Sequence, residues 1–141
     1  MSSKTSRALS GCPVDYAVSV IGDGWSLLII RDLAVRGSKT YAELLDGWEG
    51  ISTNILAQRL RHLEEKGVIT KRKNPDNWRS FIYELSAKGR DLAPVLSELV
   101  LWGGKYNDAK EPMTETLSHV QSDRQGFEST ILVANTNTAE T

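Results

Sequence analysis

The sequence has 141 residues, of which 40% are apolar and 25% are charged, and this is the composition of an ordinary globular domain. A chain of this length supports one domain with a real core, so no second, ligand-binding domain is expected. Because the formal net charge is −1, a case for nucleic-acid binding has to rest on how the charges are distributed.

Several classes of protein are disfavoured at this level. The single cysteine argues against an internal disulfide framework and a cysteine-rich zinc site. Residues 1–11 contain no apolar run suited to a signal peptide, and the apolar run at residues 25–30 stops at Arg31 and Asp32. We therefore expect a soluble intracellular protein with no membrane segment, no metal and no cofactor.

A short helix is expected at residues 14–21, since Pro13 takes a favoured first helical position. Cys12 would then lie at the helix N-terminus, where partial positive charge favours the thiolate, although Asp15 opposes this effect. Two interpretations stay open, a thiol that senses oxidants or electrophiles and a structural thiol near a dimer interface. Oxidation would give a sulfenic acid, a mixed disulfide with a small thiol or a disulfide to a second subunit.

The next three helices have distinct patterns. Residues 26–34 are apolar on nearly every side and predict a buried central helix. Residues 40–46 predict a short helix with Thr40 as N-cap and the capping-box spacing. After a glycine-containing turn, residues 51–67 predict a longer helix with Ser52 as N-cap and Gly67 as a left-handed C-terminal cap. Two helices joined in this way form a helix-turn-helix unit.

The helix at residues 51–67 has an apolar face and a polar face. Leu56, Leu60 and Leu63 fall on one side, so this side must pack on a core. Hydrogen-bonding side chains are concentrated in the N-terminal half of the opposite side. Such groups suit a helix in the major groove, where Asn or Gln reads adenine and Arg reads guanine. Alone, the pattern also fits an ordinary surface helix.

A hairpin follows this helix. Residues 68–73 are β-branched and end in a basic run, residues 74–77 are a turn signal, and residues 80–85 alternate apolar side chains. A helix-turn-helix followed by a hairpin is a winged helix, a mainly α fold with a small β-hairpin. Between Arg59 and Arg90, nine Lys or Arg stand against four Asp or Glu, as expected for phosphate contacts.

The candidate DNA contacts fall into two groups. Side chains near the start of the long helix are expected in the major groove, with its two arginines on phosphate or guanine. The basic side chains of the hairpin are expected on the adjacent backbone. The candidates are Ser52, Thr53, Asn54, Gln58, Arg59, Arg61, Lys71, Arg72, Lys73 and Arg79.

Ser86 opens a last long helix, predicted to run to about Trp102, in which Pro94 should either bend the helix or mark a new start. Its apolar side chains, together with residues 12–21, predict a homodimer interface, and a monomer that folds the helix back is the alternative. Residues 1–106 are thus expected to be one DNA-binding and dimerisation domain. Residues 107–141 are expected to be an acidic, polar and mostly mobile tail, in which residues 131–133 add a strand or dock on the partner.

Across residues 10–106 the chain resembles the HxlR-type winged-helix transcriptional regulators of bacteria and archaea. The likeness is carried by residues 12–14, 21–25 and 28–33, by the helix at 51–67, by residues 83–89, and by Trp102 and Gly103. The resemblance implies a homodimer on double-stranded DNA. It also supports the sensor interpretation of Cys12, since several such regulators sense oxidants, quinones or aldehydes through a cysteine at this place.

The expected function is that of a sequence-specific DNA-binding regulator, a repressor on a pseudo-palindromic operator. Two other classes remain open. An enzyme using Cys12 as nucleophile is disfavoured, because neither histidine is placed in sequence as a base and no glycine-rich phosphate loop occurs. A protein-interaction module that kept the winged helix without DNA binding is the main alternative. The operator, the effector and the sign of regulation are not encoded in these patterns.

Overall fold

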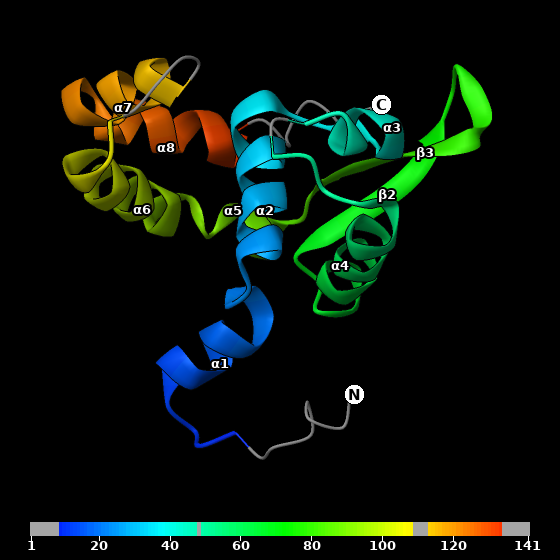
Figure 1. Cartoon of the computed structure of the whole chain (residues 1–141), viewed down its shortest axis with the longest axis horizontal. Helices are drawn as coiled ribbons and strands as arrows, with labels where there is room; N and C mark the ends of the chain where they lie inside the picture. The colour runs from blue at the N-terminus through cyan, green and yellow to red at the C-terminus, as the bar shows by residue number, and fades with distance from the viewer. Residues whose placement is uncertain (1–8, 48, 109–112, 134–141) are drawn as a thin grey trace.

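The protein is represented by a computed structural model that describes residues 9–47, 49–108 and 113–133. In these ranges, the fold is mainly helical and contains a three-stranded antiparallel sheet whose β2–β3 hairpin projects from one side, as expected for a winged helix (Figure 1). The helices are α1 (Pro13–Ile21), α2 (Gly24–Arg36), α3 (Tyr41–Leu45), α4 (Thr53–Glu65), α5 (Ala87–Arg90), α6 (Ala93–Tyr106), α7 (Met113–Ser122) and α8 (Arg124–Val133). The strands are β1 (Lys39–Thr40), β2 (Ile69–Asn74) and β3 (Asn77–Leu85).

Helix α2 stands at the centre of the molecule. The β2–β3 hairpin and α4 lie on one side of α2, and α6 to α8 lie on the other. Helix α1 extends away from the N-terminal end of α2 (Figure 1). Ile30 of α2 is fully buried, as is Leu56 of α4, and the two belong to one core cluster. This confirms the prediction of a buried central helix. Within the described ranges, no helix combines the length and apolarity that a bilayer crossing needs.

The hairpin prediction is confirmed, and a third strand adds to it. Strand β3 lies between β1 and β2, with Ile69 opposite Leu85 and Lys39 opposite Tyr83. The two-residue strand β1 was not predicted, because so short a strand has no periodicity of its own and exists only through its pairing with β3.

The last long helix predicted from the sequence is two helices, α5 and α6. Pro94 lies in the first turn of α6, where its missing N–H removes no helical hydrogen bond. Of the two outcomes expected for Pro94, the new start is the one observed. Ser86 caps α5 as predicted, with its hydroxyl accepting a hydrogen bond from the Gly89 N–H.

The structure differs from the sequence-based expectation in the segment after Asn107. Instead of a mostly mobile tail, residues 113–133 form α7 and α8, and Val120, Phe127 and Ile131 are almost fully buried. A few apolar residues at helical spacing suffice here because α6 supplies the opposing surface, which local composition does not reveal. Residues 131–133 belong to a helix rather than a strand. Residues 134–141, also assigned to the tail, lie outside the described residues.

Candidate nucleic-acid interface

Helix α4 is fixed at its ends and along its apolar side as predicted. The Ser52 hydroxyl accepts a hydrogen bond from the Ile55 N–H at 3.3 Å, and Gly67 has a left-handed φ of +76°. Leu56, Leu60 and Leu63 are buried. The Tyr41 hydroxyl of α3 donates to the Thr53 carbonyl oxygen at 3.0 Å, which links the two helices of the helix-turn-helix unit.

The exposed side of α4 presents side chains that have no partner in the described part of the chain. Asn54, Gln58 and Arg61 are exposed there, and none forms a hydrogen bond or ion pair with other described residues. We call these three residues the reading face. Ser52 and Thr53 are exposed at the start of the helix beside them. The predicted major-groove residues are therefore accessible together on the outside of the molecule.

Arg59 and His62 point elsewhere. Arg59 forms an ion pair of 3.2 Å with the carboxylate of Asp23, the residue that caps α2. The His62 ring nitrogen Nε2 lies 2.8 Å from the carbonyl oxygen of Val20 in α1. The sequence placed both residues on or beside the polar side of α4, and it contained no signal for these contacts with residues 36 and 42 positions away.

The basic candidates of the wing, the β2–β3 hairpin, are all exposed. Two have acidic neighbours, since Lys71 lies 3.9 Å from Glu64 and Arg72 lies 3.5 Å from Glu84. Lys73 has no such neighbour among the described residues. Neither does Arg79, whose guanidinium lies 5.2 Å from the centre of the Trp78 ring. The last two cations are thus the least neutralised charges of the wing.

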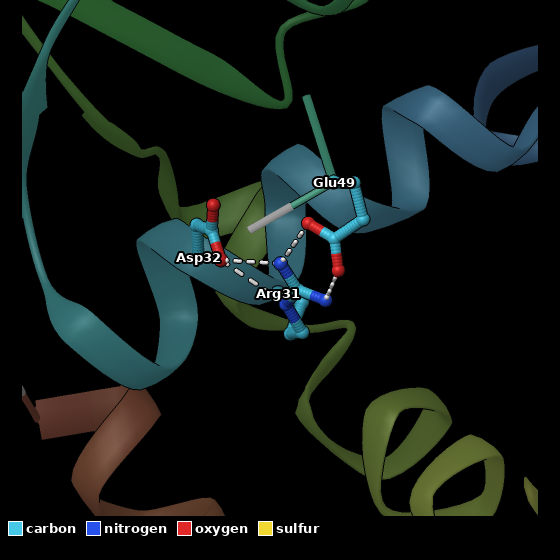
Figure 2. A network of polar contacts seen from close by, with 3 residues as sticks. All are labelled: Arg31, Asp32 and Glu49. Carbon is cyan, nitrogen blue, oxygen red and sulfur yellow. Dashed lines mark hydrogen bonds and ion pairs between the residues drawn. The ribbon is translucent and has the colours of Figure 1, made fainter. Parts of the chain in front are cut away.

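A half-buried arginine fixes the turn that leads into α4. Arg31 of α2 donates to both carboxylate oxygens of Glu49, at 2.7 and 2.9 Å, and to Asp32 at 2.7 Å (Figure 2). Hydrogen bonds from Arg31 lower the pKa of Glu49, against partial burial, which raises it. The sequence showed Arg31 and Asp32 only as charges interrupting an apolar helix. The structure makes Arg31 a tie between the central helix and the helix-turn-helix unit.

Cys12 is exposed and is the N-cap residue of α1, as predicted. Its side chain makes no regular capping hydrogen bond, but the backbone N–H groups of Asp15 and Val14 lower the pKa of the thiol. The Asp15 carboxylate accepts a hydrogen bond from the Ser10 N–H at 2.8 Å. This geometry is compatible with a reactive thiol.

Exposed apolar side chains line one side of α6 and part of α1. On α6 they recur at spacings of four, three and four residues, which places them on one helical stripe. They are Val95, Leu99, Trp102 and Tyr106. In α1, Val14 and Val18 have exposed fractions of 69% and 53%. These two helices are the ones for which the sequence predicted a dimer interface.

Comparison with known proteins agrees with this geometry. The sequence profile of the HxlR-like helix-turn-helix family matches residues 20–111. An uncharacterized HTH-type transcriptional regulator of Synechocystis, sll1512, is 38% identical over 85 residues, which are 60% of this chain and 62% of that relative. YvaP, an uncharacterized HTH-type transcriptional regulator of Bacillus subtilis, is 32% identical over 69% of this chain and 90% of its own length.

A solved structure extends the comparison. The redox regulator HypR in its oxidized form has a TM-score of 0.62 and 26% identity, covering 70% of this chain and 100% of that one. Since the family profile spans most of the present chain, the chain belongs to the HxlR-like helix-turn-helix family and is a transcriptional regulator of the helix-turn-helix type.

Proposed function

We propose that this regulator binds double-stranded DNA as a homodimer and reads its operator with α4 in the major groove. The observation that carries the proposal is the reading face, three polar side chains that are exposed together and unpartnered within the described residues. Asn54 and Gln58 have the amide groups that pair with adenine edges, and Arg61 has the fork that pairs with guanine or phosphate. Ser52 and Thr53 accompany them at the start of the helix.

The wing supplies the part of the affinity that does not depend on sequence. Lys73 and Arg79 contact phosphates, and Lys71 and Arg72 do so once they leave their carboxylate neighbours. A homodimer joined through α1 and α6 presents two copies of α4. Such a dimer requires a pseudo-palindromic operator, with half-site centres roughly 34–36 Å apart on successive major grooves. Occupying a promoter in this way represses transcription, and the protein works in the cytoplasm, where the DNA is.

The thiol of Cys12 is proposed as the input. It is exposed, its pKa is lowered, and it lies at the start of a helix that we place in the dimer interface. HypR, a redox regulator, has a similar fold and sequence. A peroxide would oxidise the Cys12 thiolate to a sulfenic acid, which could condense with a second thiol to give a disulfide and water. Either product would change the packing of α1 and thereby release the DNA.

Fluorescence-anisotropy titration of DNA from upstream of the gene tests the proposal, with random DNA for comparison, at two salt concentrations. Asn54→Ala or Gln58→Ala is expected to weaken binding to the specific duplex by about 1–3 kcal/mol and to leave random DNA unaffected. Lys73→Ala should weaken both equally and reduce the salt slope by about one. Glu65→Ala, an exposed change in the last turn of α4, is the control for the reading face.

The outcomes separate the classes that the sequence left open. Equal losses on specific and random DNA for Asn54→Ala would refute the division between reading face and wing. No specific binding by the unmodified protein at either salt would favour the protein-interaction module. Binding that collapses on oxidation, and survives it in Cys12→Ser, would support the thiol input, whereas binding indifferent to oxidation would remove that input alone.

A further inference from the structure

We propose that Arg59 and His62 are positioning residues, which hold α4 against α1 and the α1–α2 junction, and that neither contacts DNA. This inference rests on the proposed function, because it concerns how α4 is presented to an operator. It reassigns Arg59, which the sequence pattern placed among the DNA contacts.

The first contact uses a free backbone group at the end of α1. The last four carbonyl groups of a helix lack helical partners, and the Val20 carbonyl is one of them. His62 Nε2 lies 2.8 Å from this oxygen. A histidine donates from Nε2 both as the neutral Nε2–H tautomer and as the imidazolium, so the contact does not depend on the charge of the ring. His62 thereby holds the C-terminal turn of α1 against the last turn of α4.

The second contact holds the other side of the α1–α2 junction. Arg59 Nη1 lies 3.2 Å from Asp23, whose carboxylate also accepts from the Ser26 N–H at 2.8 Å and from its hydroxyl at 2.7 Å. Burial raises the pKa of Asp23, but the Ser26 hydrogen bonds and the Arg59 charge outweigh it and hold this pKa below its ordinary value. The carboxylate is therefore charged at neutral pH and neutralises Arg59.

A third contact closes the end of α4. The Lys88 ammonium donates to the carbonyl oxygen of Lys66, which caps α4, at 2.7 Å. It also donates to the Tyr16 hydroxyl of α1 at 2.8 Å. Lys88 thus links the C-terminal end of α4 with the first turns of α1, so contacts with α1 and its junction extend from the middle of α4 to its end.

These contacts occupy a separate side of α4. At about 100° per residue, Arg59, His62 and Lys66 fall within about 60° of one another. The buried leucines and the reading face fall on two other sides. We call the side with Arg59, His62 and Lys66 the anchor face. An α4 with three such sides is oriented by α1 as well as by the core, so the direction of the reading face depends on α1.

In a dimer, the orientation of α4 affects which arrangement of half-sites binds best. Since α1 belongs to the proposed dimer interface, the anchor face sets how far apart, and at what angle, the two copies of α4 lie. Loosening the anchor face should therefore penalise a duplex with two half-sites more than a duplex with one. A residue that only contacts phosphate would weaken both and would change the salt slope.

The experiment compares Arg59→Met, His62→Leu and Asp23→Asn with the unmodified protein, on a duplex selected from random sequence and on its single half-site. Asn at position 23 keeps an N-cap oxygen for α2 and removes only the charge. All three variants are expected to weaken two-half-site binding about tenfold and half-site binding less than about threefold, with an unchanged salt slope. His62→Gln, which keeps a donor, should recover most of the affinity.

If Arg59 instead contacts a phosphate, Asp23→Asn and Arg59→Met should have different effects on binding. Asp23→Asn would then free Arg59 and strengthen binding, and Arg59→Met would lower the salt slope by about one. Either result would overturn the inference. Failure of the unmodified protein to select any duplex would count against the proposed function instead. The anchor contacts are then judged by amide hydrogen exchange, since faster exchange of residues 16–21 in His62→Leu is expected and unchanged exchange would refute them.

Discussion

The chemistry of single residues here is set by backbone groups at the ends of helices. Cys12 meets the N–H groups of the first turn of α1, and His62 meets a carbonyl of its last turn. Both are groups that a helix leaves unpaired, so their effects follow from the position of the residue relative to α1.

The Cys12 thiol should ionise at lower pH than an ordinary cysteine. The Asp15 and Val14 N–H groups stabilise the thiolate and lower its pKa, so the rate of alkylation by iodoacetamide should rise with pH through a midpoint below the ordinary value of about 8.5. The matched control is Ala17→Cys in a Cys12→Ser background, which places a thiol at an exposed site within the same helix, away from its N-terminus. Equal midpoints for the two thiols would contradict the predicted effect of the helix N-terminus.

At the scale of elements, the helix-turn-helix unit is joined to α2 by ionic contacts as well as by its leucines. The Arg31 contact with Glu49 precedes α4, and the Arg59 contact with Asp23 holds its middle. Both acids have lowered pKa values. A group whose folded-state pKa is lowered stabilises the fold above its unfolded pKa, and this stabilisation is lost as the pH falls through the folded pKa.

Glu49→Gln should therefore destabilise the protein at neutral pH and have no effect in acid. We expect a loss of about 1 kcal/mol in the free energy of unfolding at pH 7, because the pair is partly exposed and solvent weakens it. The difference should vanish below the lowered pKa of Glu49, where the carboxyl is protonated in both states. Urea unfolding of both proteins from pH 7 down to pH 3 measures this, and a constant difference across that range would exclude the ionic explanation.

The elements that sequence predicted are those whose signals are local. Thr40 and Glu43 form the predicted capping box, and Pro94 begins a helix, because each effect depends on residues within one turn. The Arg59 contact with Asp23 joins residues 36 positions apart, and nothing in the local pattern indicates which acid an arginine will meet. The exposure of Asn54 and Gln58 was predictable from helical periodicity, whereas their role on DNA remains a prediction.

At the scale of the whole molecule, α7 and α8 extend the core beyond the region that the family profile matches. That region ends at residue 111, and Val120, Phe127 and Ile131 belong to the same buried cluster as Leu96 of α6. The close approach is visible at Gly104, where an added Cβ would lie 2.6 Å from the Leu117 side chain. The polar composition of residues 107–141 concealed this packing, since a helix that covers one side of another needs few apolar residues.

Phe127→Ala tests this extension of the core. Removing a buried phenylalanine side chain should cost about 3–5 kcal/mol of the free energy of unfolding, through lost burial and the cavity left behind. Leu132→Ala, at an exposed site on the same helix, should change it by no more than about 0.5 kcal/mol. Thermal and urea unfolding followed by circular dichroism measure both. If Phe127→Ala destabilised the protein as little as Leu132→Ala is expected to, α8 would not contribute to a common core.

The exposed apolar stripe of α6 predicts that the protein is dimeric and that the dimer is needed for DNA binding. Trp102 is 69% exposed and Leu99 is 43% exposed, which would leave large apolar side chains in water in a monomer. A glutamate at position 102 would have to be buried unpaired in the dimer, so Trp102→Glu should give a folded monomer with a far-UV spectrum like that of the parent. Light scattering coupled to gel filtration measures the mass.

The monomer should bind a two-half-site duplex no more tightly than a single half-site, because the second contact is no longer intramolecular. Leu132→Glu, which puts the same charge on an exposed apolar site of α8, should remain dimeric and keep the preference for two half-sites. If instead Trp102→Glu kept the dimeric mass, the interface would have to lie elsewhere. The proposal that α1 sets the separation of the two copies of α4 would then lose its support. The anchor face could then no longer affect the spacing of the two half-sites through α1.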